Sequence, residues 1–307
     1  MLFRFVWGAL AVFVLLVIAR AVRIASLPVH LRWELYPVAH EENAHYGGSF
    51  LEHLDWWKRK RHTSVLGELK VMVPEILLLK AVHEHNRPLW YRSFPFHFGL
   101  YLLALFVVLL AGGGVAQSMG FVIGEGASAA GAALHWATMS AGYGGLVLMG
   151  LGAGLLLVRR LGDPALRAYS APADYLNLLL FVAMSALGLA ATVTSDLDFV
   201  ALRGFMQGLL TLKFDAAAPA GIVMAEIVAA TLLLVYIPTT HMAHFFTKWF
   251  MYHGIRWDDQ ANMVGSPLER RIVAQLGYKV DWAAAHIQGG GRKTWVDVAT
   301  EKQENKS

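Results

Sequence analysis

The 307-residue sequence contains no cysteine. The chain therefore cannot form a disulfide, offer a thiolate ligand or hold an iron–sulfur cluster by itself, so any cluster that the function needs must come from a partner. Charged residues are also scarce, at 16%, and they are almost absent from five long apolar stretches. Runs of this length exclude an ordinary soluble globular protein and indicate a polytopic membrane protein. We therefore expect it to lie in a lipid bilayer and not to bind nucleic acid.

A helix needs about 20 apolar residues to cross the hydrocarbon core of a bilayer. The stretches that meet this length run approximately from Phe5 to Ile24, Phe94 to Gln117, Ala130 to Val158, Tyr175 to Thr194 and Ala220 to Phe246. The first stretch is followed by Arg20 and Arg23 rather than by a small-residue cleavage site, so we interpret it as a retained helix and not as a signal peptide. The predicted fold class is an all-α membrane protein with a bundle of five transmembrane helices.

Lysine and arginine are distributed unevenly between the segments that alternate across such a bundle. The segment Arg20–Arg92, the connection Val158–Tyr175 and the tail after Phe246 together hold 23 of the 26 Lys and Arg residues, and the opposite side holds 3. The positive-inside rule then predicts an N-terminus outside and a C-terminus in the cytoplasm. The expected parts are a first transmembrane helix at 1–24, a long cytoplasmic or interfacial segment at 25–93, a four-helix core at 94–250 and a cytoplasmic partner-binding tail at 251–307.

Three further patterns predict local features. Residues Val65–His85 have the spacing of an amphipathic helix with a kink at Pro74, which either lies on the bilayer or docks a partner. Residues Phe205–Phe214 suit a short interfacial helix near the outer leaflet. The third apolar stretch is rich in glycine, which lets a neighbouring helix, or a flat macrocycle, approach closely, and helix packing alone is a sufficient reason.

Two histidines lie at the same edge of two apolar stretches, His97 near the start of the second and His244 near the end of the fifth. A transmembrane b-type haem needs this placement: two imidazoles from two helices at one membrane depth, leaving no open position on the iron. The alternative is that each histidine lies at the interface or bonds a neighbouring helix. His241 precedes His244 by three residues and lies within about 60° of it on a helix, so either could be the ligand on geometry alone.

An acidic residue occupies the same predicted stripe as His244. Counting back 18 residues, or five turns of α-helix, reaches Glu226, about 27 Å away near the outer edge. A second haem above the first would need histidines near Val107 and Glu226, and the sequence has neither. Glu226 and His135 are protonatable groups in the outer half, where a quinol could release protons to the outer water; the alternative for Glu226 is a hydrogen-bonded structural acid.

Four segments resemble a known family, the cytochrome b gamma subunit of respiratory nitrate reductase. They are FPFHFGLYLL, AGYGGLVLMGLGAGLLLVRR, ADYLNLLLFVAMSALGL and VYIPTTHMAHFF, and the resemblance covers about Phe94–Trp249. It implies that His97 and His244 are the axial ligands of the haem nearest the soluble subunits, with His241 as a basic residue beside that haem. The positions that match the ligands of the family's second haem hold Val107 and Glu226, which argues for one haem b.

The same resemblance implies where a quinone binds and which partner the chain has. His135 and Trp136 fall where the gamma subunits help to form the quinol site, beside Glu226 in this reading. The segments RWELYP, DWWKRK, WAAAHI and TWVDVATE are similar to the Dsr and Tmc branch of heterodisulfide reductase-like complexes. In that branch the partner is a cytoplasmic iron–sulfur subunit related to the heterodisulfide reductase catalytic subunit, alongside further membrane or periplasmic cytochrome subunits.

These observations predict a membrane subunit of a quinol/quinone oxidoreductase complex in the bacterial inner membrane. It would pass electrons between menaquinol or a related quinone and the cytoplasmic iron–sulfur subunit through haem b, without being a nitrate-reducing catalytic subunit itself. One alternative is a haem-free membrane anchor for a soluble redox partner. Another is a transporter with Glu226 as proton carrier, which predicts inverted repeats that the sequence does not contain.

Overall fold

The computed structural model describes residues 1–26, 36–37, 53–55, 58, 64–213, 217–257, 264–284 and 287–301. The chain divides into two compact units. The first unit comprises Met1–Val17 and Pro74–Met242, and the second comprises Ile18–Val73 and Ala243–Ser307. The motifs RWELYP and DWWKRK lie largely outside the described residues.

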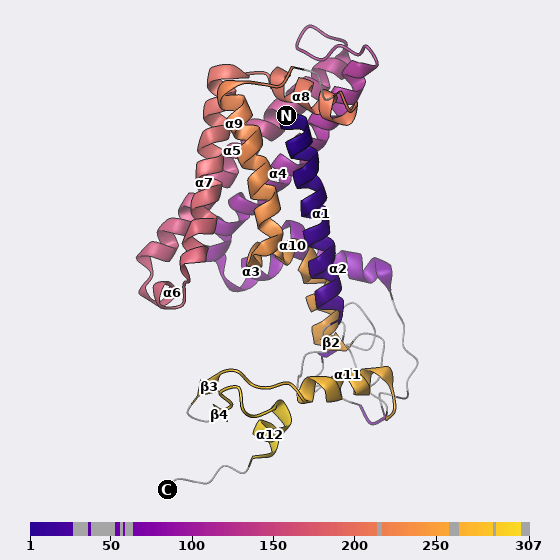
Figure 1. Ribbon diagram of the computed structural model, residues 1–307, viewed down its shortest axis with the longest axis vertical. Coiled ribbons are helices and arrows are strands. Elements are labelled where there is room, and N and C mark those ends of the chain that lie inside the picture. The colour runs from indigo at the N-terminus through magenta and orange to yellow at the C-terminus, as the bar shows by residue number, and fades with distance from the viewer. Residues whose placement is uncertain are drawn as a thin grey trace. The chain divides into compact units, whose positions relative to one another are not determined.

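Long apolar helices dominate the chain (Figure 1). They are α1 (Leu2–Ser26), α4 (Arg87–Ser118), α5 (Ala129–Gly162), α7 (Pro172–Ser195) and α9 (Gly221–Tyr236). Among the residues that the structure describes, five helical segments are long and apolar enough to cross a membrane, the last of them taken as Gly221–Thr239. The prediction of a helical, multi-pass integral membrane protein with five spanning helices is therefore confirmed, while the orientation of its termini stays a prediction.

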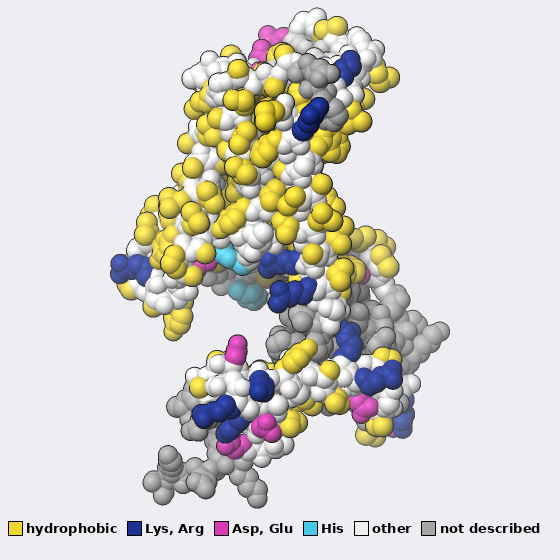
Figure 2. Space-filling model, in the orientation of Figure 1, with side chains coloured by type: hydrophobic (Ala, Val, Ile, Leu, Met, Phe, Trp, Pro, Cys, Tyr) yellow, Lys and Arg dark blue, Asp and Glu magenta, His cyan; other side chains and the backbone are white. Residues whose placement is uncertain are grey.

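Short helices join the spans. They are α3 (Lys80–His85), α6 (Pro164–Ala168), α8 (Val200–Leu210) and the 3₁₀ turns η3 (Ile237–Thr239) and η4 (His241–Ala243). The N-terminus lies beside α8, and α6 lies at the opposite end of the bundle (Figure 1). On the face shown in Figure 2, hydrophobic side chains cover the spanning helices, and Lys, Arg and His side chains gather near the α6 end. Such a band separates a lipid-facing surface from a wet edge.

Glycines set the spacing between α4 and α5. A Cβ atom added at Gly152 would overlap the backbone nitrogen of Phe96 in α4, and one added at Gly145 would lie 2.8 Å from the side chain of Leu103. A Cβ atom added at Gly142 would likewise overlap the rings of Phe199 and Phe106. Close helix packing thus accounts for these glycines, as predicted. Beyond this contact, α4 packs against α8, α5 against α7, and α7 against α9.

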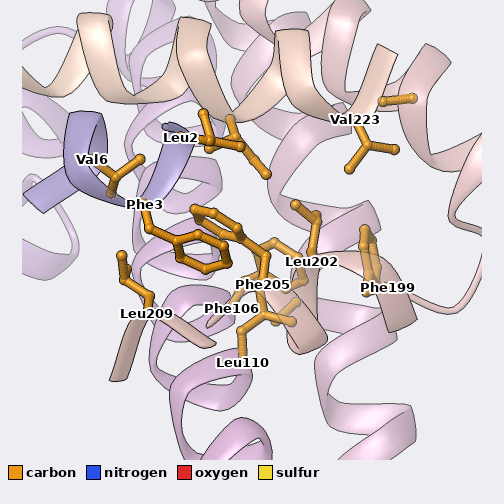
Figure 3. Packing of buried hydrophobic residues seen from close by; sticks show 13 residues of the cluster. Leu2, Phe3, Val6, Phe106, Leu110, Phe199, Leu202, Phe205, Leu209 and Val223 are labelled. Carbon is orange, nitrogen blue, oxygen red and sulfur yellow. The ribbon is translucent and has the colours of Figure 1, made fainter. Parts of the chain in front are cut away.

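Two clusters form the buried core of the first unit. The cluster at the α8 end joins residues of α1, α4, α8 and α9, and Figure 3 shows Leu2, Phe3 and Val6 of α1 pointing towards it. The rings of Phe3 and Phe205 stack there at 4.7 Å. The second cluster consists of Phe96, Met149, Ala153 and Phe181 from α4, α5 and α7.

The interfacial helix begins earlier than predicted, at Val200 rather than Phe205. Asp196 is the reason, because its two carboxylate oxygens accept hydrogen bonds from the backbone N–H groups of Ala201 (2.8 Å) and Leu202 (2.9 Å). These are two of the donors that a helix N-terminus leaves unpaired. The helix consequently ends at Leu210, before the predicted Phe214.

The predicted amphipathic helix forms two pieces, α2 (Val65–Leu77) and α3. The helix continues through Pro74 and is interrupted five residues later at Leu79, whose φ is +52°. A proline removes only the N–H group that points back one turn, and its own carbonyl still accepts from the N–H of Leu78 at 3.0 Å. The helical segment is thus broken at the left-handed Leu79, and the kink at Pro74 stays a prediction.

The second unit contains α10 (His244–Ile255), α11 (Pro267–Leu276) and α12 (Trp295–Thr300). Two-residue strands pair β1 (Tyr36–Pro37) with β2 (Arg256–Trp257) in parallel and β3 (Ala283–Ala284) with β4 (Ile287–Gln288) in antiparallel fashion. In the tail, the buried Val280 exchanges backbone hydrogen bonds with Lys293 (2.8 Å) and Gly291 (2.7 Å). The tail thus has a local fold built around one small apolar residue.

Candidate functional site

His97 projects from α4 next to the second core cluster and is half-buried. Its Nδ1 donates to the backbone carbonyl of Ser93 at 2.8 Å and lies 3.2 Å from the Ser93 hydroxyl. When Nδ1 carries the proton, Nε2 has the free lone pair and can bind iron. In metal sites, a hydrogen bond from the other ring nitrogen fixes the tautomer and the orientation of the imidazole in this way. The donor chemistry of His97 therefore fits an axial haem ligand.

The fifth span is not one continuous α-helix. α9 ends at Tyr236, and two 3₁₀ turns follow before α10 begins at His244. Pro238 supplies no N–H group, and the Thr240 hydroxyl accepts from the N–H of Met242 at 3.1 Å, which starts the next helical segment. The predicted stripe of five unbroken turns from Glu226 to His244 is therefore wrong. His97 belongs to the first unit and His244 to the second, so their pairing on one haem stays a prediction.

His241 lies in an ionic cluster at the α6 end of the first unit. Its Nε2 is 3.8 Å from Oδ1 of Asp174, and its side chain is 64% exposed. Oδ2 of the same carboxylate is 3.2 Å from Nη1 of Arg160 and accepts from the N–H of Ala171 at 2.9 Å. His241 thus has an acidic neighbour at the bundle edge, and its place as a secondary haem ligand stays a prediction.

Glu226 is buried inside the bundle, as an exposed fraction of 7% shows. One of its carboxylate oxygens would lie 3.1 Å from a Cβ atom at Gly188, so the missing side chain of this α7 glycine makes room for the acid. A cavity of about 320 Å³ opens one turn away between α7 and α9. Its walls are apolar except for the Tyr236 hydroxyl, and they include Leu187 and Ala229.

The two other residues predicted at the quinone site, His135 and Trp136, lie away from Glu226. His135 is 3% exposed and faces the interior, whereas its neighbour Trp136 is 53% exposed, because consecutive helical residues point about 100° apart. Leu146 marks the depth of Glu226 on α5, since it contacts the same Gly188. His135 precedes Leu146 by 11 residues, or about 16 Å along the helix axis. The structure therefore does not bring His135 or Trp136 to Glu226.

Arg203 is a buried charge that the sequence reasoning treated only as an outer positive residue. It is 1% exposed, its Nη2 donates to the carbonyl of Asp198 at 3.3 Å, and its Nε has no partner among the described residues. Burial lowers the pKa of Arg203, and the nearby Asp196 opposes that shift. Two aspartates shortly before an arginine in the segment TSDLDFVALRGF are the signal that could have revealed this cluster.

Two more buried polar residues, Asn177 and Ser185, were not singled out from the sequence. Both lie on α7 and are 3% exposed. Oδ1 of Asn177 accepts from the hydroxyl of Tyr236 at 2.9 Å, which ties α7 to the end of α9. The Nδ2 of Asn177 and the Oγ of Ser185 have no hydrogen-bond partner in the described part of the chain.

The chain matches a known protein family. The family model described as nitrate reductase gamma subunit matches residues 82–258, which is more than half of the 307 residues. The matched range includes α4 to α10 and all six candidate residues named above for haem and quinone. The search of curated proteins gives no match.

Proposed function

The chain belongs to the nitrate reductase gamma subunit family, whose members are quinol-interacting membrane cytochrome b subunits of oxidoreductase complexes, and on this premise we propose its specific role. The protein passes electrons between menaquinol or a related quinone and a cytoplasmic iron–sulfur subunit. The observation that carries this proposal is the His97 imidazole within the family-matched span, held by Ser93 in the iron-binding tautomer.

His97 and His244 are the residues proposed to hold one haem b, with His241 as a secondary candidate. When bound by these residues, the haem would supply a one-electron carrier. Support for a single haem comes from Val107, the residue at the matching position for a second ligand on α4. Its side chain is apolar and 50% exposed. The hydrogen bond between His97 and Ser93 supports haem binding because it fixes the orientation of one ligand before any haem binds.

Glu226 is proposed to exchange protons with the quinone oxygens. Quinol oxidation releases two electrons and two protons, so a protonatable group must stand beside the reacting hydroxyl groups. Glu226 is buried one turn from the α7–α9 cavity, whose size lies at the small end of ligand pockets. His135 and Trp136 remain predicted contributors at the start of α5, at a distance from that acid.

The proposed partner is an iron–sulfur protein related to the heterodisulfide reductase catalytic subunit, as in the Dsr and Tmc branch, with further cytochrome subunits in the same complex. A chain without cysteine cannot hold a cluster, which makes such a partner necessary for onward electron transfer. The proposed location is the bacterial inner membrane, with the N-terminus outside. The second unit would then face the cytoplasm, and half-exposed aromatics such as Tyr278 and Trp282 suit a docking surface there.

Replacing Glu226 by glutamine tests the quinone chemistry. Glutamine has nearly the same shape but cannot exchange the proton, so we expect quinol-driven haem reduction to slow by roughly 100-fold while the haem absorption spectrum stays unchanged. The measurement is stopped-flow haem reduction by a menaquinol analogue, with the exposed Glu125→Gln as control. Normal turnover in Glu226→Gln would return Glu226 to a structural role.

A further inference from the structure

One face of α7 carries polar residues near both ends and at its middle, with Phe181 between them. Successive buried or half-buried residues on this face lie three to eight positions apart and within an arc of about 100° on a helical projection. They are Asp174, Asn177, Ser185, Gly188, Thr192 and Asp196, with Phe181 between the second and the third. The Glu226 side chain of α9 packs against this face at Gly188. A polar stripe across a membrane span is costly, so it calls for a reason beyond packing.

The two halves of the stripe differ in how their polar atoms are satisfied. On the Asp196 side of Glu226, the Thr192 hydroxyl donates to the carbonyl of Gly188 at 2.7 Å, and the Asp196 carboxylate accepts two backbone hydrogen bonds. On the Asp174 side, Ser185 Oγ and Asn177 Nδ2 are buried without partners among the described residues. Buried polar atoms of this kind are normally paired with ordered water.

The first of these unpartnered atoms packs against a glycine of α5. A Cβ atom at Gly150 would lie 2.9 Å from Ser185 Oγ, so the glycine makes room for the serine side chain. Ser185 is three residues from Gly188, or about 4.5 Å along the helix axis from the depth of Glu226. Serine can both donate and accept, which a proton relay through water requires. Arg203 Nε, the unpartnered atom nearer the other end, is a permanent donor and cannot relay protons.

The lower half of the stripe ends in water-exposed titratable groups. Asn177 bonds the Tyr236 hydroxyl, and one turn further Asp174 meets Arg160 and the exposed His241. Phe181 occupies the step of about 12 Å between Asn177 and Ser185, with its ring edge-on to Phe96 at 5.0 Å. Bridging water beside Phe181 is therefore needed to complete a connection.

We propose that this face of α7 is a proton path between Glu226 and water at the Asp174 end of the bundle. The sequence alone favoured release at the opposite, outer end, but the unpartnered hydroxyl of Ser185, which can both donate and accept, lies on the Asp174 side of Glu226. The inference deepens the proposed function, since it fixes the side on which quinone protons are exchanged. If the Asp174 end is cytoplasmic, protons and electrons leave quinol on the same side, and turnover does not separate charge across the bilayer.

The path can be tested without quinol or haem. A carboxyl group buried in a membrane span keeps its proton at rest, because a charge there is costly. The full chain in lipid nanodiscs is transferred to deuterated buffer, and infrared spectroscopy follows deuterium exchange of the Glu226 carboxyl band, assigned by its loss in Glu226→Gln. We expect Ser185→Ala to slow this exchange by about tenfold or more, because its hydroxyl relays the proton, and Asn177→Leu to slow it as well, because its amide donates to the bridging water.

Thr192→Val is the matched control, because it removes a hydroxyl on the same face at the other side of Glu226. It should leave the exchange rate unchanged. Slower exchange in Thr192→Val with a normal rate in Ser185→Ala, equal rates in all variants, or no protonated Glu226 band would each overturn the path. Quinol-driven haem reduction, measured separately, tells whether the proposed function fails while the path holds.

Discussion

Asp196 shows how much one residue between two helices can determine. It ends α7 as its C-cap, its carboxylate caps α8 through the N–H groups of Ala201 and Leu202, and its negative charge opposes the pKa shift of the buried Arg203. A buried guanidinium without an anionic neighbour would be strongly destabilising. The same aspartate therefore starts the interfacial helix and makes the burial of its arginine tolerable.

Replacing Asp196 by alanine should destabilise the protein by about 2–4 kcal/mol, because two helix-capping bonds and the charge near Arg203 are lost together. Asp198→Ala is the control, since Asp198 is exposed and the bond from Arg203 goes to its backbone carbonyl; we expect a loss of less than about 1 kcal/mol. Thermal unfolding in detergent measures both. Equal losses would contradict the capping role of Asp196.

Some of these residues could be found from sequence and others could not. His97, His135 and Glu226 are conspicuous because they interrupt apolar stretches. The pairing state of Asn177 and Ser185 depends on which side chains of α5 and α9 approach α7, and that is a property of the fold. The direction of Trp136, next to the buried His135, was equally hidden, because adjacent helical residues share sequence context but not surroundings.

The backbones of α4 and α5 lie very close together where glycines face the opposite helix. Gly152 admits the backbone of Phe96, one residue before His97, and Gly99 of α4 admits the backbone of Met149 in return. Backbones at this distance gain dispersion contacts along the whole interface, which is the main attraction between helices in lipid. This helix–helix contact fixes the position of the α4 turn that carries His97.

Gly152→Ala should destabilise the protein by about 1–3 kcal/mol or more, because the new methyl group meets backbone rather than a movable side chain. It should also lower haem content by displacing His97. Gly154→Ala is the control: it lies two residues away on α5 with nothing within 4 Å, so its effect should stay below about 1 kcal/mol. Unfolding temperature and haem absorbance of the two variants check this, and matching behaviour would contradict the account.

The spanning helices were predicted well, because length and apolarity alone define them. The break in the fifth span was not. Pro74 and Pro95 both lie inside continuous helices, so a proline by itself does not end a helix here. At Pro238 the following Thr239 and Thr240 hydroxyls donate to carbonyls of the preceding turn and stabilise its 3₁₀ geometry. Such local competition is difficult to weigh from sequence.

At the level of the whole molecule, the function depends on orientation. The proposed topology places the α6 end, with Arg160 and His241, in the cytoplasm, and the α8 end outside. This arrangement puts the candidate haem histidines on the side of the soluble partner. It also makes the proton path from Glu226 open towards the cytoplasm.

The absence of cysteine makes this topology directly measurable, because each introduced cysteine is the only one. We expect Glu125→Cys, in the α4–α5 connection, to react with a membrane-impermeant maleimide in intact spheroplasts. Tyr169→Cys, at a residue 92% exposed beside α6, should react only after the membrane is opened. The reverse labelling pattern would invert the topology.

The pyridine haemochrome assay on the purified chain measures whether His97 and His244 hold a single haem b. We expect about one haem per polypeptide, lost in His97→Ala and in His244→Ala and retained in His241→Ala. Wild-type protein without haem would identify a membrane anchor instead. An unchanged reduced-haem spectrum in His244→Ala, or a content near two, would contradict the assignment.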